Sequence, residues 1–471
     1  QLQGGNSWAN GRSPLGTSSE TAMNHIGRYE ICGRLGRGGM STVYKARSPI
    51  TERIVALKVL KPRDEIFEDL VGWQKLKELF IEEARTMGAI THDHVAKVID
   101  ADLDDDTPFM VLEYFSHSIG DFIGEAYKVE EDTRVISIPR SYMYLCQLLK
   151  GLERLHFAGV VHRDIKPYNM MITNDDRVKI IDFGLSRVRG EESLAIPGMQ
   201  VGSPYYAAPE QMAAPEKADG RADLFSAGVL MYRMLTGKLV ELKMGGIMPP
   251  SRFKPDLSAA WDQFLATALA PTAGDRFASA QEMRLQLEDV FDEWQSDSAA
   301  TCRWYRPTEQ DPKRSEVSPR SKPVRLMYKD IRQELQLDSL FRPRRFHDHQ
   351  LQIVSPLRLC DPHTGLHWQR QGSGYTLDWH QAHTYVDYLN EQRFQGISTW
   401  RLPTTEELLS ILRPPTVERD ICLDPSFAPS IHWLWSADHC NKKQAWMADI
   451  VESYLGRQDL DGTASVCAVS N

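Results

Sequence analysis

Two short segments constrain this chain more than any others: HRDIKPYN at residues 162–169 and DFG at residues 182–184. The first follows the apolar pair Val160-Val161, and the second follows the apolar run VKII. Both segments therefore stand where short strands are expected to end. Such positions are favoured for chemistry, because a rigid scaffold there holds a loop of polar side chains.

These segments hold the groups that phosphoryl transfer needs. Asp164 can accept the proton of an attacking hydroxyl, and Lys166 can offset charge on the moving phosphate. Asn169 and Asp182 offer hard oxygen ligands, which suit magnesium, whereas no nearby Cys or His spacing suits zinc. We therefore predict Asp164 and Lys166 as catalytic residues and Asn169 and Asp182 as metal ligands.

A glycine-rich segment, LGRGGMSTVYKA, follows the first strand pattern of the chain. Gly36, Gly38 and Gly39 permit a tight turn whose backbone N–H groups can approach phosphates. Strand patterns flank the segment on both sides, which disfavours Rossmann and Walker sites because those lead from a strand into a helix. Lys58, in VALK, lies on a further strand pattern and is predicted to reach the same phosphates.

A lysine beside a nucleotide needs a carboxylate to hold it, and FIEEARTM offers Glu82 and Glu83. On a helix of about 100° per residue, Glu83 falls about 60° from Phe80 and Glu82 about 160° from it. Glu83 is thus expected on the inward face, where an unpaired carboxylate is costly. We predict that Glu83 pairs with Lys58; the alternative is a rim glutamate on an amphipathic helix.

The ordered set of glycine loop, VALK, Glu83, HRDIKPYN, DFG and AAPE resembles that of bacterial Hanks-type (eukaryotic-like) serine/threonine protein kinases. The resemblance covers about residues 28–293. It implies a bilobal α+β kinase fold that binds ATP and Mg²⁺ and phosphorylates Ser or Thr of protein substrates. Its catalytic residues would be Asp164, Lys166, Lys58 and Glu83. Its nucleotide-binding residues would be Gly36, Gly38, Gly39, Val43, Ala56, Lys58, Met171 and the hinge residues Glu113 to Phe115.

The same resemblance assigns supporting roles. His162, Phe183 and Met87 would join a packed spine. Asp223 would anchor the backbone of the catalytic loop, although a plain helix N-cap is the alternative. Glu210 and Arg276 would form a structural ion pair.

The chain also departs from the family pattern. Ser41 replaces the usual third glycine of the loop, and no threonine lies between DFG and AAPE. Ser186, Ser193 and Ser203 are the hydroxyl residues of that segment. Ser193 is the candidate activating phosphosite, whereas Ser203 is expected to be structural.

Composition sets limits on the whole chain. With 471 residues, 42% hydrophobic and 25% charged, it is a globular protein of two or three domains. A net charge of −9 argues against nucleic-acid binding, and no stretch is apolar enough for a membrane span. Seven scattered cysteines favour the cytoplasm. The expected domains are 1–27 (a disordered leader or expression remnant), 28–293 (kinase, with lobes 28–112 and 113–293), 294–345 (a basic, Pro-containing linker) and 346–471.

The last segment is similar to the Lcl-type C-terminal domain, a small mixed α/β relative of C-type-lectin-like and formylglycine-generating-enzyme folds. The similarity rests on DPHTGLHWQRQ, DWHQAHTYVDYLN, TWRLPTTEELLSIL, WLWSAD and AWMADI. Trp368, Trp400 and Trp435 are expected in its core, and Thr404 or Thr405 should open a helix. The His, Asp and Cys residues of HWLWSADHC fit no zinc spacing, so buried structural side chains are expected there.

Three functions fit this sequence. The first is an active Ser/Thr kinase whose tail binds a ligand or protein partner. The second is a binding scaffold that responds to nucleotide while the tail carries the main role, although such scaffolds usually lack one of Lys58, Asp164 and Asp182. The third makes the tail an enzyme of the formylglycine-generating type, which would need a defined cysteine pair among Cys422, Cys440 and Cys467.

Overall fold

The computed structural model describes most of the chain: residues 25–62, 71–125, 129–182, 187–188, 205–214, 218–241, 246–302, 319–347, 351–415, 421–428 and 432–471. The chain divides into two compact units. The first comprises Gln1–Phe80 with Asp100–Leu112, and the second comprises Ile81–Ile99 with Glu113–Asn471.

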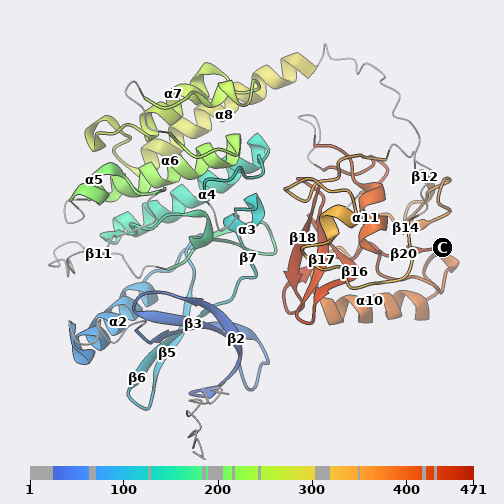
Figure 1. Ribbon diagram of the computed structural model, residues 1–471, viewed down its shortest axis with the longest axis horizontal. Helices are drawn as coiled ribbons and strands as arrows, with labels where there is room; N and C mark the ends of the chain where they lie inside the picture. The colour runs from blue at the N-terminus through green and yellow to red at the C-terminus, as the bar shows by residue number, and fades with distance from the viewer. Residues whose placement is uncertain are drawn as a thin grey trace, which may run out of the picture. The chain divides into compact units, whose positions relative to one another are not determined.

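The first unit is built on a six-stranded sheet of order β1-β2-β3-β4-β6-β5 (Figure 1). The strands are β1 (His25–Ile26), β2 (Tyr29–Arg37), β3 (Ser41–Arg47), β4 (Ile54–Leu60), β5 (Val98–Asp104) and β6 (Thr107–Glu113). Each strand contains β-branched or aromatic side chains, which favour strands. Ala46, Leu57 and Phe109 are among the residues of its buried core. Helix α2 (Trp73–Gly88) crosses the boundary between the two units.

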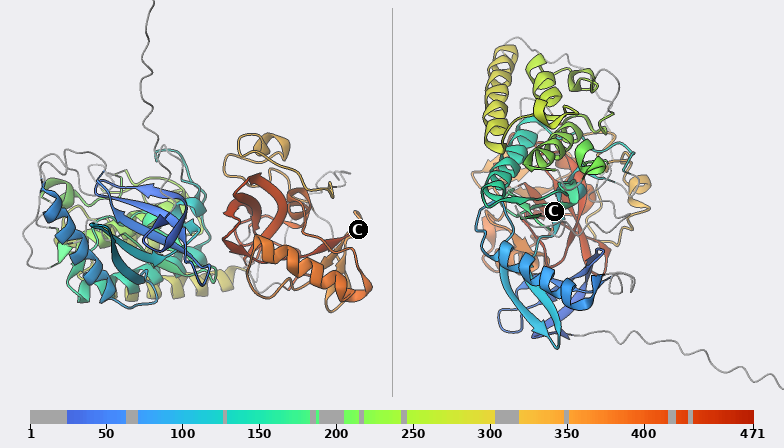
Figure 2. Two further views of the ribbon diagram at one scale, coloured as in Figure 1. Left: turned by 90° about the horizontal axis from the view of Figure 1, so that it is seen from below. Right: turned by 90° about the vertical axis from the view of Figure 1, so that its left-hand side faces the viewer.

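Helices dominate the large-lobe part of the second unit. They are α3 (Ile119–Ile123), α4 (Ile138–Phe157), α5 (Pro209–Ala213), α6 (Gly220–Thr236), α7 (Ala259–Ala268) and α8 (Ala280–Cys302). α4 packs against both α6 and α8 (Figures 1 and 2). α6 is buried along nearly its whole length, as its all-round apolar sequence predicted.

Short strands and turns carry the loops of the large lobe. β8 (Val160–Val161) pairs with β11 (Arg187–Val188), and β9 (Met170–Ile172) lies between β10 (Val178–Ile180) and β7 (His117–Ser118). Single 3₁₀ turns lie at Pro167–Asn169 (η1), Pro250–Arg252 (η3) and Ala273–Asp275 (η4). The segment 162–169 therefore connects β8 to β9. Its backbone is held by a strand at each end.

Three small sheets lie in the described residues of the tail. β12 (Gln352–Ser355), β13 (Arg358–Cys360), β14 (His367–Gln369) and β20 (Val469–Ser470) form the first. β16 (Trp433–Asn441), β17 (Gln444–Asp449) and β18 (Tyr454–Asp459) form the second, and β15 (Leu377–Asp378) with β19 (Thr463–Ala464) the third. Its helical segments are α9 (Ile331–Glu334), α10 (Trp379–Glu391), η5 (Phe394–Gly396) and α11 (Thr405–Ile411). The predicted core tryptophans, Trp368, Trp400 and Trp435, are all buried.

The tail begins inside the segment expected to be a linker. Leu326, Ile331, Leu337 and Phe341 belong to the same buried apolar cluster as Trp368. Arginines and prolines flank these apolar positions. The segment therefore has the basic composition of a linker, although its apolar residues are buried. Residues 326–341 are therefore part of the tail's packed core.

Helix α11 begins as the sequence predicted. The Thr404 side chain accepts from the Glu407 backbone N–H, and the Glu407 side chain accepts from the Thr404 backbone N–H. This is a capping box, which satisfies two backbone donors at the helix start.

The α+β fold expected from the sequence is confirmed, with a strand-rich small lobe, a helical large lobe and a strand-rich tail. In the part of the chain that the structure describes, no helix has the length and apolar character that crossing a membrane would require.

Candidate active site

The predicted phosphate-binding residues of the first unit lie across three neighbouring strands. Gly36 of β2 is the register partner of Val43 on β3, and Val43 is the register partner of Lys58 on β4. The glycine turn between β2 and β3 is closed by a hydrogen bond from the Gly38 N–H to the Ser41 carbonyl, 2.8 Å long. A Cβ at Gly36 would meet no atom within 4 Å, so the backbone there is open to a ligand. Gly39 lies in the same turn.

Lys58 and Ala56 are both buried on β4. On α2, Glu82 is exposed and Glu83 is half-buried, while Met87 is buried. Pairing of Lys58 with Glu83 stays a prediction.

The catalytic loop of the second unit is held by one buried carboxylate. Asp223 on α6 accepts hydrogen bonds from the backbone N–H groups of His162 (2.9 Å) and Arg163 (2.7 Å). The His156 ring also contacts Asp223, at 2.8 Å. Burial would raise the pKa of Asp223, but the His156 contact and the backbone donors outweigh it and lower the pKa below its usual value. The predicted anchoring role is confirmed, and the helix N-cap is Asp219 instead.

The backbone adopts a strained conformation at two residues of this region, one just before Asp164 and one at the predicted metal ligand Asp182. Arg163 has φ of 66°, and Asp182 has φ of 61°. Non-glycine residues seldom adopt this left-handed region, and such residues often mark functional sites. The Asp223 hydrogen bond to the Arg163 N–H helps to hold the first of these conformations.

The two carboxylate oxygens of Asp164 differ in their surroundings. Oδ2 accepts from Lys166 Nζ at 2.6 Å and from Asn169 Nδ2 at 2.9 Å. Oδ1 is buried and, among the described residues, has no hydrogen-bond partner. A buried acceptor without a partner is costly, and a substrate hydroxyl could supply the missing donor. The carboxylate is thus fixed by one oxygen and open at the other.

The two predicted metal ligands are joined through the backbone. The Asn169 side chain donates from Nδ2 to both the Asp164 carbonyl (2.8 Å) and the Asp164 carboxylate. The Asn169 carbonyl accepts from the Ile181 N–H at 3.0 Å, one residue before Asp182. Asn169 Nδ2 is thus engaged, and the amide oxygen is the atom that the predicted metal site would use. An amide oxygen and a carboxylate are the donor types that magnesium prefers.

The predicted hinge segment begins at Glu113, which is the last residue of β6. Glu113 accepts from the Lys97 N–H at 3.0 Å and lies 3.5 Å from Lys179 Nζ. Met171 on β9 is the register partner of Lys179. Phe115, the other predicted hinge residue, is half-buried. Contact of any of these residues with adenine stays a prediction.

The large lobe contains the predicted ion pair and an unforeseen support for the loop. Arg276 donates to both carboxylate oxygens of Glu210, at 2.7 and 2.8 Å, which confirms the structural ion pair. Gln211, the next residue, is buried and donates from Nε2 to the Arg163 carbonyl at 2.5 Å. Nothing in the sequence indicated the role of Gln211, because it is the single buried residue of the otherwise exposed or half-buried helix α5. Phe183, Ser186, Ser193 and Ser203 lie outside the described residues.

Asp438, the aspartate of HWLWSADHC, has the structural role that the sequence predicted. Asp438 accepts hydrogen bonds from Arg320 at 2.8 and 2.9 Å and from the Thr405 N–H at 2.8 Å. Among the described residues, no three His, Cys, Asp or Glu side chains are grouped to hold a metal ion.

Three cysteines of the tail lie in its interior. Cys422, Cys440 and Cys467 are free thiols in buried positions. Burial raises the pKa of Cys467 to about 12, which disfavours the reactive thiolate.

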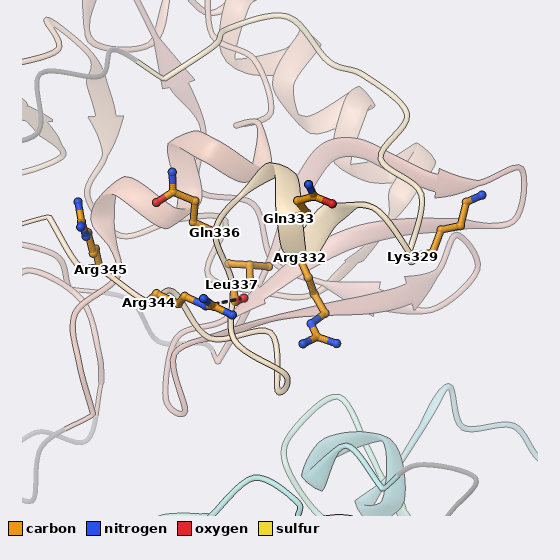
Figure 3. A pocket seen from close by; sticks show the side chains of 7 residues that line it. All are labelled: Lys329, Arg332, Gln333, Gln336, Leu337, Arg344 and Arg345. Atoms are coloured by element: carbon orange, nitrogen blue, oxygen red, sulfur yellow. Dashed lines mark hydrogen bonds between the residues drawn. The ribbon is translucent and has the colours of Figure 1, made fainter.

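A basic cavity of about 600 Å³ lies beside α9 (Figure 3). It is lined by Lys329, Arg332, Gln333, Gln336, Leu337, Arg344 and Arg345. Four of these side chains are cationic and none is acidic, so the cavity is suited to an anionic group.

Comparisons with known proteins agree with this geometry. Residues 29–245 match the protein kinase domain family, and residues 359–470 match the Lcl C-terminal domain family. A probable serine/threonine-protein kinase of Clostridium acetobutylicum is 30% identical over 294 residues, which cover 60% of this chain and 43% of that protein. A probable serine/threonine-protein kinase of Streptomyces coelicolor is 32% identical over 286 residues, covering 56% and 40%.

A third relative is the serine/threonine-protein kinase Pkn1 of Myxococcus xanthus, 31% identical over 294 residues that cover 59% of this chain and 40% of that protein. The chain thus spans less than half the length of these curated relatives. Two parts of the chain thus resemble known families: residues 29–245 are similar to the protein kinase domain, as in bacterial serine/threonine kinases, and residues 359–470 are similar to the Lcl C-terminal domain.

Proposed function

We propose that this protein is a serine/threonine kinase that transfers the γ-phosphate of ATP, bound with Mg²⁺, to Ser or Thr hydroxyls of protein substrates. The observation that carries the proposal is the asymmetric Asp164 carboxylate, with one oxygen fixed and the other buried without a partner. The similarity to bacterial serine/threonine kinases supports it independently.

Each residue has a defined part in the reaction. Asp164 Oδ1 accepts the hydroxyl hydrogen, which orients the oxygen for attack on the γ-phosphorus. The new P–O bond forms as the bond to the departing ADP breaks, and Asp164 takes the proton. Lys166, which is only partly buried, can move from Asp164 to the charge on the transferred group. A bound magnesium ion, held by Asn169 and Asp182, would neutralise charge on the phosphate oxygens.

The tail is proposed to bind a ligand or a protein partner for the kinase. The basic cavity beside α9 offers a surface for an anionic group, whereas the buried thiols offer no support for an oxidase. In this proposal the tail recognises a ligand or a protein partner, and the kinase domain carries out the reaction.

Asp164→Asn tests the catalytic proposal. The amide cannot take the proton, so transfer of radiolabelled phosphate from ATP to a generic protein substrate should fall by about 100-fold or more. Binding of ATP should change little, because Asp164 is assigned to the hydroxyl and not to the nucleotide.

The matched control is Asp175→Asn, which changes an exposed aspartate of the same lobe. It should leave transfer unchanged, because exposed ion pairs contribute little. Full activity of Asp164→Asn would refute the assigned role of Asp164.

A further inference from the structure

One buried arginine links the large lobe to the tail within the second unit. Arg140 on α4, which is 4% exposed, lies 3.0 Å from Asp176 Oδ1 of its own lobe. The same guanidinium donates to both oxygens of Asp449 on β17, at 3.3 and 3.4 Å, and Asp449 is 0% exposed. Tyr144 completes the group by donating to Asp176 at 2.5 Å. Two buried carboxylates, one from each domain, thus share one guanidinium.

The tail prepares Asp449 for this contact. Asp449 also accepts from Trp433 Nε1 at 2.8 Å and from the backbone N–H groups of Val451 (2.9 Å) and Glu452 (2.7 Å). Its position is therefore fixed by the turn between β17 and β18. A buried charge with this many partners is tolerated, whereas one that loses its counter-charge is strongly unfavourable.

A second tail carboxylate caps a large-lobe helix. Ser137 is the N-cap of α4 but makes no side-chain capping bond to that helix, and the first turn contains no acidic residue. Buried Glu452 accepts from both the Ser137 N–H (3.0 Å) and the Ser137 hydroxyl (2.9 Å). A negative charge is favourable at a helix N-terminus, because the helix dipole is positive there. The tail thus supplies an anion that α4 lacks.

Aromatic packing surrounds these polar contacts. Tyr454 of β18 meets Phe122 of α3 edge-on, with 6.0 Å between ring centroids. The Arg134 guanidinium lies 3.9 Å from the centre of the same Tyr454 ring, and Arg134 also donates to the Leu340 carbonyl at 2.8 Å. Such a desolvated shell strengthens the charged contacts that it encloses.

A further hydrogen bond joins the tail to the predicted hinge segment. The Tyr114 hydroxyl donates to Asp459 Oδ2 at 2.8 Å. Asp459 is itself held by Gln444, whose Nε2 donates to Oδ1 at 3.1 Å. Tyr114 lies between Glu113 and Phe115, the two hinge residues predicted to hydrogen-bond adenine. A tail side chain therefore restrains the backbone next to the predicted nucleotide contacts.

We propose that the tail is an integral docked part of the kinase, and that Asp459 is a positioning residue that holds the hinge segment ready for ATP through Tyr114. The tail's partner is the large lobe of its own chain, on a docking surface formed by Tyr114, Ser137, Arg140 and Asp176. Preorganising a binding segment removes an ordering cost from ligand binding. Docking thus increases nucleotide affinity. This inference rests on the proposed function, because it takes ATP as the ligand.

The test measures nucleotide affinity in the full chain with Tyr114→Phe, Asp459→Ala and the double variant. Displacement of a fluorescent ATP analogue reports binding without any phosphoryl transfer. Each single change removes the hydrogen bond between Tyr114 and Asp459, so the Kd for ATP should rise about two- to tenfold. The double variant should match either single variant, because both changes remove the same interaction. In transfer assays the KM for ATP should rise while kcat stays nearly constant.

Asp387→Ala, at an exposed position of α10, is the matched control and should leave the Kd unchanged. An unchanged Kd in both single variants, or additive effects in the double variant, would overturn the positioning role. A chain that binds ATP but transfers no phosphate would refute the proposed function alone, since the affinity measurement would still decide the role of Asp459.

Discussion

Asp164 shows how a single side chain is prepared by its neighbours. Lys166 and Asn169 bind one of its oxygens, which fixes the rotamer of the carboxylate and leaves the other oxygen available. Asp223 and Gln211 act one step further away, on the backbone N–H and carbonyl of Arg163. The site therefore depends on buried polar residues that touch no substrate.

The variant Asp223→Asn tests whether Asp223 holds the loop. Both carboxylate oxygens accept backbone N–H groups, so an amide places an N–H donor against a donor. We expect a loss of stability of about 1–3 kcal/mol and a lower kcat, with ATP affinity nearly unchanged. Thermal unfolding and steady-state kinetics measure both effects.

Asp219→Asn is the control on the same helix. Asp219 is the N-cap of α6, and asparagine caps helices about as well as aspartate. Its stability and kcat should match those of the unchanged chain. Equal behaviour of the two variants would mean that Asp223 does not hold the loop.

At the scale of elements, α6 and α7 approach closely because of one glycine. A Cβ built at Gly228 would lie 2.9 Å from the Cβ of Ala268 and 3.3 Å from Leu269. Helix propensity alone favours alanine over glycine by about 1 kcal/mol. The close packing of the two helices reverses this preference.

Gly228→Ala should therefore destabilise the large lobe, at a cost of about 1–3 kcal/mol from overpacking. Adding Ala268→Gly opens the contact and should restore part of the lost melting temperature. Gly88→Ala, at the end of α2 with no atom within 4 Å of the added Cβ, should not lower the melting temperature. A stable Gly228→Ala variant would show that the helices can separate without cost.

At the scale of the whole molecule, the docking surface makes stability depend on pH. Burial would raise the pKa of Asp176, but Arg140, His432 and Tyr144 outweigh it and hold the pKa well below its usual value. A carboxylate with a lowered pKa stabilises the fold above its unfolded-state pKa of about 3.9, and loses this effect as the pH falls towards the lower folded value.

The melting temperatures of the unchanged chain and Asp176→Asn should therefore differ by a constant amount above about pH 5 and converge below about pH 4. Differential scanning fluorimetry across this range measures the difference. Asp175→Asn, one residue away but exposed, should show no such gap. A gap that persisted unchanged at pH 3 would contradict an ionised, paired Asp176.

Much of this protein could be predicted from its sequence, because the predictive features are local. The strand and helix patterns and a capped helix opened by Thr404 or Thr405 follow from residue type and spacing, and the structure confirms them with Thr404 as the cap. The anchoring role of Asp223 was implied by the resemblance to kinases and is also confirmed. The strained φ of Arg163 and the role of Gln211 could not be foreseen, because they depend on neighbours distant in sequence.

The sequence by itself determined the order of motifs, the α+β class and the residues predicted to handle phosphate, since short-range spacing encodes them. Only the tertiary structure decided that residues 326–341 belong to the tail's core, and that Arg140 and Asp449 share a buried contact. Those two residues are 309 positions apart in the sequence. A charge pair at that separation leaves no local pattern in the sequence. Its interaction energy depends on the removal of both groups from water, which happens only when the chain folds.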